Sequence, residues 1–292
     1  MAGRASNWLW FSVNSVAQAV AVVARNPTIG AMAKRTSIRD LQKASTEGRK
    51  LSMVTAYDAY SARLVDQAGI DIALVGDSLG TTVQGRANTL AVTLEHTLYH
   101  TEIVARCAER ALVIADMPLG SYQCGDNAAI ANCIACIKAG AQGIKLEGGA
   151  RVSKLVHRLT QAGVPVMGHI GFTPQSINAT SGPRLNKEED TLVADAKLLA
   201  ESGAFSLVLE MVPAEISRRI TAECGIPTIG IGAGPHCSGQ VLVFFDMLGY
   251  SPEFTPRFLK RYMNFHEQAL GALKQYKNDV EGGKYPGPEH SY

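Results

Sequence analysis

The sequence has little charge of either sign in any one place. Its formal net charge is +2 at pH 7 over 292 residues, and no long basic or acidic run occurs. A nucleic-acid-binding surface needs a clustered excess of Lys and Arg, so this pattern argues against a nucleic-acid partner. Hydrophobic residues make up 46% of the chain, which is ordinary for a globular protein with a sizeable core.

Cysteine is also scarce, and its positions do not form a disulfide framework. The six cysteines are scattered through apolar or helical stretches of a long chain, a distribution that fits reduced, buried thiols. Cys133 and Cys136 have metal-ligand spacing, but no second cysteine pair or nearby histidine completes a four-ligand zinc site. We therefore expect neither disulfides nor structural zinc.

Acidic residues are absent from residues 1–39, which contain five Lys and Arg residues. The apolar stretch from Trp8 to Ala24 is interrupted by Ser, Asn and Gln, so it is a weak candidate for a spanning helix of about 20 apolar residues. A basic, acid-free N-terminus is typical of a mitochondrial transit peptide, although an unstructured tail has a similar composition. We expect this segment to direct the protein to mitochondria and not to a membrane. A translation start at Met32 would instead leave a cytoplasmic product.

Beyond residue 40, short apolar runs alternate with longer stretches of helical character. Continuous apolar runs of this kind are typical of parallel strands that are buried on both faces. The expected strands are Leu51–Thr55, Ile70–Val75, Ala111–Ala115, Gly143–Leu146, Val164–Met167, Ser206–Leu209 and Ile226–Ile231. Their number favours a single (β/α)₈ barrel, an α/β TIM barrel, over residues 40–292, with an open, doubly wound sheet as the alternative.

The end of the chain is less regular. The eighth strand is expected within Val241–Phe245, a stretch that also fits a buried helix. A long C-terminal helix is expected over Phe258–Val280. The doubly wound alternative lacks a nucleotide-binding fingerprint, because Gly230-Ile-Gly232-Ala-Gly234 continues with Pro where the third glycine of G-x-G-x-x-G belongs.

Polar and charged residues follow the apolar runs where the predicted strands end. In a parallel barrel those ends converge on one mouth, where catalytic residues collect. Each residue alone has a plainer interpretation, such as a helix cap or a turn-stabilising side chain. The set consists of Asp77, Ser78, Asp116, Lys145, Glu147, His169 and Glu210.

Several carboxylates at one mouth repel one another unless a cation or shared protons offset their charge. A ligand set that is rich in oxygen and free of cysteine favours a hard divalent ion, most simply Mg²⁺. A 2-oxo acid can chelate such an ion, with Lys145 as a further charge partner, and the ion then stabilises an enolate. Glu210 is the remaining carboxylate that could remove the proton next to the carbonyl group.

Long motifs cover the same regions of the chain. They are VTAYDAYSA (Val54–Ala62), VGDSLGTTVQG (Val75–Gly85), TLAVTLEHTLYHT (Thr89–Thr101), IADMPLGSY (Ile114–Tyr122), IKLEGG (Ile144–Gly149), GHIGFTPQSIN (Gly168–Asn178), LVLEMVP (Leu207–Pro213), IGIGAG (Ile229–Gly234) and YPGPEHS (Tyr285–Ser291). In this order, from about Thr36 to the end, the sequence resembles the ketopantoate hydroxymethyltransferases, also called 3-methyl-2-oxobutanoate hydroxymethyltransferases.

The resemblance implies a barrel of the phosphoenolpyruvate/pyruvate type and Mg²⁺-dependent transfer of a hydroxymethyl group. The donor would be 5,10-methylenetetrahydrofolate, the acceptor 3-methyl-2-oxobutanoate and the product 2-dehydropantoate, in the first committed step of pantothenate synthesis. Members of the family are commonly decameric, so a homo-oligomer is implied as well.

The resemblance also implies a role for each of the polar residues at the strand ends. The family's metal ligands fall on Asp77 and Asp116, with Glu147 also reaching the ion. Its oxo-acid contacts fall on Asp77, Ser78, Asp116 and Lys145. Its general base falls on Glu210, and its active-site histidine falls on His169.

One segment departs from the family pattern. Ala179–Asp190 stands where the family has a Gly-Gly-aromatic-basic-Val-Gln-Gly run, and it is a few residues shorter. Because it follows the fifth strand at the expected mouth, this difference bears on how substrate is enclosed; a splice error in the gene model is the other explanation.

Two alternative functions stay open. One is a carbon–carbon lyase or phosphonomutase of the same barrel type, with Cys124 as its loop cysteine. The other is a barrel that has lost activity and serves in assembly.

Overall fold

The computed structural model describes residues 34–180 and 188–292. Eight parallel strands form a closed barrel in which each strand pairs with its neighbours in chain order, and β8 pairs with β1. The strands are β1 Leu51–Thr55, β2 Ile72–Val75, β3 Leu112–Asp116, β4 Gly143–Glu147, β5 Val166–Gly171, β6 Ser206–Glu210, β7 Thr228–Ile231 and β8 Gly239–Leu242. This arrangement confirms the predicted (β/α)₈ barrel and excludes the open sheet.

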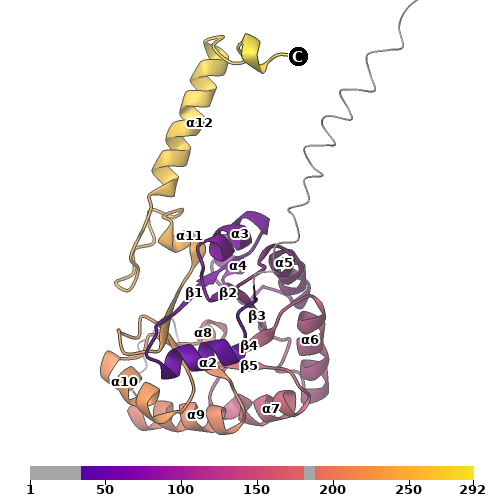
Figure 1. Cartoon of the computed structure of the whole chain (residues 1–292), viewed down its shortest axis with the longest axis vertical. Helices are drawn as coiled ribbons and strands as arrows, with labels where there is room; N and C mark the ends of the chain where they lie inside the picture. Colours follow the sequence, from indigo (N-terminus) through magenta and orange to yellow (C-terminus); the bar gives the residue numbers. More distant parts are fainter. Residues whose placement is uncertain (1–33, 181–187) are drawn as a thin grey trace, which may run out of the picture. The chain divides into compact units, whose positions relative to one another are not determined.

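Helices alternate with the strands, and α6, α7, α9 and α10 follow one another around the outside of the barrel (Figure 1). The longer helices are α2 Ile38–Thr46, α3 Ala59–Gln67, α5 Leu94–Cys107, α6 Asp126–Lys138, α7 Ala150–Gln161, α9 Glu189–Glu201, α10 Ala214–Glu223 and α12 Phe265–Glu281. The short helices are α4 Leu79–Thr82, η1 Pro174–Ser176, α8 Ile177–Thr180, α11 Phe244–Met247 and η2 Pro288–His290. No helix within the described ranges is long and apolar enough to cross a bilayer.

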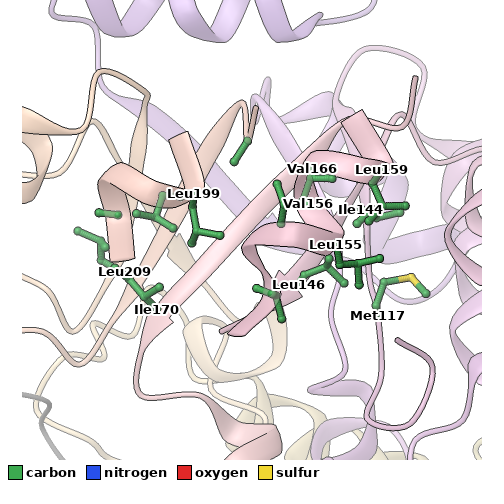
Figure 2. Close-up of a cluster of buried hydrophobic side chains, with 14 of the residues drawn as sticks. Met117, Ile144, Leu146, Leu155, Val156, Leu159, Val166, Ile170, Leu199 and Leu209 are labelled. Atoms are coloured by element: carbon green, nitrogen blue, oxygen red, sulfur yellow. The ribbon is translucent and has the colours of Figure 1, made fainter. Parts of the chain in front are cut away.

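The strands separate two apolar layers. Side chains inside the barrel form one buried cluster, which includes Met53, Ile114 and Met167. Side chains outside it, such as Leu146, pack beneath the helices with Leu155 of α7 (Figure 2). Successive side chains of a strand point to opposite faces, so the outward direction of Leu146 turns its neighbours Lys145 and Glu147 inward.

Helix α2 closes the amino-terminal end of the barrel. Its buried residues Leu41 and Ala44 belong to the same cluster as the barrel interior. Ser37 precedes the helix and forms a capping box with Asp40, which satisfies two backbone donors of the first turn. Apolar side chains thus fill most of this end, and the buried charged side chains of the strands lie at the opposite end.

Helix α2 is absent from the sequence-based prediction, which sets residues 1–39 aside as a targeting segment. The Arg35 guanidinium donates hydrogen bonds to the Ala108 carbonyl (2.6 Å) and to Gln142 Oε1 (3.1 Å). These contacts and α2 place residues 35–39 in the barrel domain. Residues 1–33, which carry the rest of that prediction, lie outside the described residues, as do residues 181–187 of the divergent segment.

The predicted eighth strand is wrong in its boundaries. The strand covers Gly239–Leu242, and α11 begins at Phe244. The Phe244 amide donates to Thr55 Oγ1 (2.9 Å), which turns the chain out of the barrel wall. The expected strand Val241–Phe245 therefore splits between β8 and α11.

The C-terminal helix begins later than predicted, at Phe265 and not at Phe258. The amides of Tyr262 and Phe265 donate to the carbonyl oxygens of Met247 and Leu248. These hydrogen bonds hold the preceding segment against α11, so its backbone donors are used there and not in an additional turn of helix.

Candidate active site

The carboxyl ends of β2 to β6 bring the predicted site residues to one mouth of the barrel. Parallel pairing sets Asp116 beside Lys145 and Glu147 beside His169. The residues and their positions are Asp77 and Ser78 after β2, Asp116 at the end of β3, Lys145 and Glu147 on β4, His169 on β5, and Glu210 at the end of β6. All seven predicted residues therefore lie at the end of the barrel that α2 leaves open.

Lys145 is the central cation of this group. Its Nζ forms an ion pair with Asp116 Oδ1, and it lies 3.8 Å from Glu147 Oε1. The side chains of Lys145, Asp116 and Glu147 are 5%, 3% and 1% exposed. The Asp77 amide donates to the other oxygen of Asp116, Oδ2, at 3.2 Å. The buried ammonium of Lys145 thus offsets the charge of more than one buried carboxylate.

Burial and crowding shift the proton affinities of these groups. Burial raises the pKa of Asp77 well above its usual value, and the charges of Asp116 and Glu147 add to the shift. Burial also raises the pKa of Asp116, opposed by Lys145 and reinforced by Glu147. Burial lowers the pKa of Lys145, but the three carboxylates outweigh it, so the pKa is raised and the ammonium keeps its proton.

His169 bridges two carboxylates. Its Nδ1 lies 3.4 Å from Glu147 Oε1, and its Nε2 lies 3.3 Å from Glu210 Oε2. Neither ring nitrogen meets hydrogen-bond geometry with a described residue, so both contacts are ion pairs at slightly longer range. Burial and Lys145 lower the pKa of His169, but Glu147 and Glu210 outweigh them and raise it to about 9. The ring is therefore an imidazolium at neutral pH.

Glu210 is the most open of the carboxylates, with a side chain 20% exposed. The backbone around it is tightly constrained. Gly171 has φ 99°, and a Cβ atom there would lie 2.1 Å from the Glu210 carbonyl oxygen, so no other residue fits without a shift. The next residue after Glu210, Met211, also has a positive φ of 50°, which is costly for a residue with a side chain. These backbone constraints set the end of β6 at Glu210, whose side chain points into the mouth.

Ser78 stands slightly apart from the charged residues. It precedes α4, but its side chain makes no capping hydrogen bond to a described residue. Its Oγ instead forms a 2.7 Å hydrogen bond with the buried hydroxyl of Tyr57. This contact holds the Ser78 hydroxyl at the mouth and excludes the plainer interpretation of Ser78 as a helix cap.

Gln175 is part of the site but is absent from the sequence-based prediction. Its Nε2 donates to Asp77 Oδ2 (3.1 Å) and to the Met117 carbonyl (2.9 Å). Its amide N–H donates to Glu147 Oε2 (3.1 Å), and its Oε1 accepts from the Tyr122 hydroxyl (2.7 Å). The available signal is its place in the GHIGFTPQSIN motif just after the fifth strand, although a neutral side chain in a loop gives no chemical cue.

The carboxylates at the mouth fit a cation that binds to one or two of them. Among the residues that the structure describes, no three His, Cys, Asp or Glu side chains are grouped closely enough to coordinate one ion. The residues fit an ion held by one or two carboxylates, with water and substrate completing the shell, as is common for Mg²⁺. Glu147 Oε1 is buried and forms no hydrogen bond in the described ranges, although Lys145 and His169 lie within 4 Å of it. Burial raises the pKa of Asp77, and the nearby charges of Asp116 and Glu147 raise it further. Both observations favour a cation here.

A cavity of about 510 Å³ lies beside the mouth. Its lining includes Glu147, Tyr122 and Gln175, together with Arg151 and Lys154 from α7. Asp77, Asp116 and Glu210 do not line it. The cavity therefore adjoins the charged residues at Glu147, and Gln175, which lines it, also contacts Asp77.

Comparisons with known proteins point to one family. The family model for ketopantoate hydroxymethyltransferase matches residues 35–288. The chain is 47% identical over 258 residues to a 3-methyl-2-oxobutanoate hydroxymethyltransferase of Ignicoccus hospitalis, covering 87% of this chain and 98% of that protein. It is 50% identical over 245 residues to the protein of the same name from Pyrococcus abyssi, covering 82% of this chain and 86% of that protein.

Solved structures share the fold at lower identity. A 2,3-dimethylmalate lyase, described as a member of the PEP mutase/isocitrate lyase superfamily, aligns with a TM-score of 0.56 and 17% identity over 86% of this chain and 90% of that chain. A phosphonopyruvate hydrolase complexed with oxalate and Mg²⁺ aligns with a TM-score of 0.57 and 13% identity over 87% of this chain and 92% of that chain. These likenesses confirm the expected barrel type, and they concern the fold alone.

The lyase and phosphonomutase alternative therefore rests on a shared fold, whereas the transferase relatives match in sequence along nearly their whole length. Cys124, the loop cysteine of that alternative, is exposed between β3 and α6. The chain belongs to the ketopantoate hydroxymethyltransferase family.

Proposed function

We propose that this enzyme catalyses Mg²⁺-dependent hydroxymethyl transfer from 5,10-methylenetetrahydrofolate to 3-methyl-2-oxobutanoate, giving 2-dehydropantoate and tetrahydrofolate in the first step of pantothenate synthesis. The observation that carries the proposal is the placement of a buried carboxylate pair, Asp77 and Asp116, at the same mouth as the Glu210–His169 pair. The first pair suits a cation and an oxo acid, and the second suits proton transfer.

The proposed cation site comprises Asp77 and Asp116, with Glu147 in reach through water. When bound there, Mg²⁺ supplies Lewis-acid polarisation of the keto group and charge stabilisation for an enolate oxygen. Lys145 attracts the anionic oxygens of the oxo acid while remaining paired with Asp116. Ser78 Oγ, oriented by Tyr57, offers a further polar contact to the substrate.

Glu210 is the proposed base. It takes the proton from C3 of the oxo acid, and the electron pair of the broken C–H bond forms the C2=C3 bond of the enolate. C3 then bonds to the methylene carbon of the donor, and one water provides the hydroxyl oxygen of the product. The two carbon–nitrogen bonds of the donor break, and their nitrogens take up the proton removed from C3 and the second proton of the water to give tetrahydrofolate. The His169 Nε2 lies 3.3 Å from Glu210 Oε2, and this contact orients the Glu210 carboxylate.

Deuterium exchange at C3 of 3-methyl-2-oxobutanoate tests this assignment without the folate donor. We expect the wild-type enzyme to exchange the proton only with Mg²⁺ present. Glu210→Gln keeps the size of the side chain but cannot accept the proton, so exchange should fall by about 10²–10⁴-fold while oxo-acid binding persists. Glu201→Gln, an exposed change on α9, is the matched control and should exchange normally. Normal exchange by Glu210→Gln would contradict the base assignment.

A homo-oligomer is the proposed assembly. Among the described residues of α12, none is buried, and Leu270, Leu273, Tyr276 and Val280 are exposed. Their spacing places them on one face of the helix, and an apolar face of this kind is typical of an interface. A second copy of this chain is the proposed occupant, as the family resemblance implies.

Light scattering of the full chain tests the assembly. We expect a homo-oligomer for the wild type and a smaller species for Leu273→Glu, because the charge would be buried in the apolar contact. Gln275→Glu introduces the same residue at an exposed position on the opposite side of the helix and should leave the size unaltered. A monomeric wild-type protein would overturn the proposed assembly.

Mitochondrial targeting is proposed from the composition of residues 1–39, which are basic and free of acidic residues. Fusion of this segment to a fluorescent reporter should send the reporter to mitochondria. A reporter fused to residues 32–39 alone, which mimics a start at Met32, should remain in the cytoplasm. A cytoplasmic signal from the longer fusion would contradict the proposal.

A further inference from the structure

We infer that Gln175 is a positioning residue that orients Asp77 and Glu147 for the cation. The inference rests on the proposed function, since it assigns a role toward the ion of that same site. Gln175 lies in η1, directly after β5, and is buried. Through one residue, a loop after β5 is joined to carboxylates from the ends of β2 and β4.

Every hydrogen-bonding group of the Gln175 side chain is used. The two N–H groups of Nε2 have two acceptors, Asp77 Oδ2 and the Met117 carbonyl, and Oε1 accepts from Tyr122. If the amide were flipped, its oxygen would face a carboxylate and a carbonyl, and both contacts would be repulsive. Tyr122 therefore helps to fix the orientation in which Gln175 donates to Asp77.

The backbone of Gln175 acts on the second carboxylate. Its N–H donates to Glu147 Oε2 at 3.1 Å. The other oxygen of that carboxylate, Glu147 Oε1, is the buried atom that has no hydrogen-bond partner within the described residues. Gln175 thus donates a hydrogen bond from a neutral N–H group to one oxygen of Asp77 and to one oxygen of Glu147. These bonds fix the direction of the other oxygen of each carboxylate.

Donors of this kind tune metal affinity without touching the ion. An outer hydrogen bond fixes the rotation of a ligating carboxylate, and its loss typically weakens metal binding by about 10–100-fold. A neutral amide suits this place better than Lys or Arg, because it orients Asp77 without competing with the cation for the negative charge. The Gln175 side chain is therefore expected to matter for the ion even before substrate binds.

Titration of the full-length protein with Mn²⁺ alone, followed by electron paramagnetic resonance, tests the inference. Gln175→Met keeps the length of the side chain and the backbone N–H but removes the donor and the acceptor. We expect its Mn²⁺ dissociation constant to rise by at least about 10-fold, with Tyr122→Phe giving a smaller rise. The double variant should match Gln175→Met, because Tyr122 acts through Gln175. Gln161→Met, the same change at an exposed position of α7, should bind as the wild type does.

The outcomes separate the inference from the proposed function. If the wild type binds Mn²⁺ and Gln175→Met binds it equally well, the role of Gln175 is overturned while the cation site stands. If the wild type does not bind Mn²⁺, the cation site and the inference both fail. If Gln175→Met does not fold, Tyr122→Phe decides, and unchanged binding by that variant overturns the inference. A double variant whose Mn²⁺ affinity falls by the sum of the two single effects, in free energy, would also contradict action of Tyr122 through Gln175.

Discussion

The charge balance at the barrel mouth is the constraint on which the rest of the site depends. Asp77, Asp116 and Glu147 are buried together with one ammonium, that of Lys145. The imidazolium of His169 offsets part of the remaining charge and links Glu147 to Glu210. Buried charges of one sign are costly unless they are paired or hold a cation. The arrangement is therefore one that a divalent ion and an anionic substrate would complete.

The barrel makes this concentration of charge tolerable. Alternation along β4 sends Leu146 into the outer apolar layer and turns Lys145 and Glu147 inward. The lower part of the interior is filled by apolar side chains, and α2 seals the amino-terminal end. Polar groups thus collect in one layer above a packed core, and their mutual contacts replace the water that each has lost.

The sequence predicts the barrel and the position of the charged residues at its mouth, because both follow from local patterns. Apolar runs mark the buried strands, and a charged residue directly after such a run, as at Asp116 or Glu210, has to lie near the mouth. Helix α2 is missed because its short amphipathic pattern lies next to a basic segment that resembles a targeting peptide. The start of α12 is misplaced because long-range hydrogen bonds from Tyr262 and Phe265 to α11 decide it.

Gln175 is missed for a different reason. Its importance comes from contacts with Asp77, Glu147 and Tyr122, which come from three other parts of the chain. No spacing rule relates these positions, and a neutral amide does not attract attention as a carboxylate does. Only the closed barrel brings the loop after β5 back across the ends of β2 and β4.

The most direct measurement is turnover of the full chain with both substrates, before and after removal of divalent ions. We expect 2-dehydropantoate to form from 3-methyl-2-oxobutanoate and 5,10-methylenetetrahydrofolate. Chelation should abolish its formation, and added Mg²⁺ should restore it. Turnover that continues at the same rate in the chelated, metal-free enzyme would contradict the proposed Mg²⁺-dependent reaction, as would the absence of product with Mg²⁺ present.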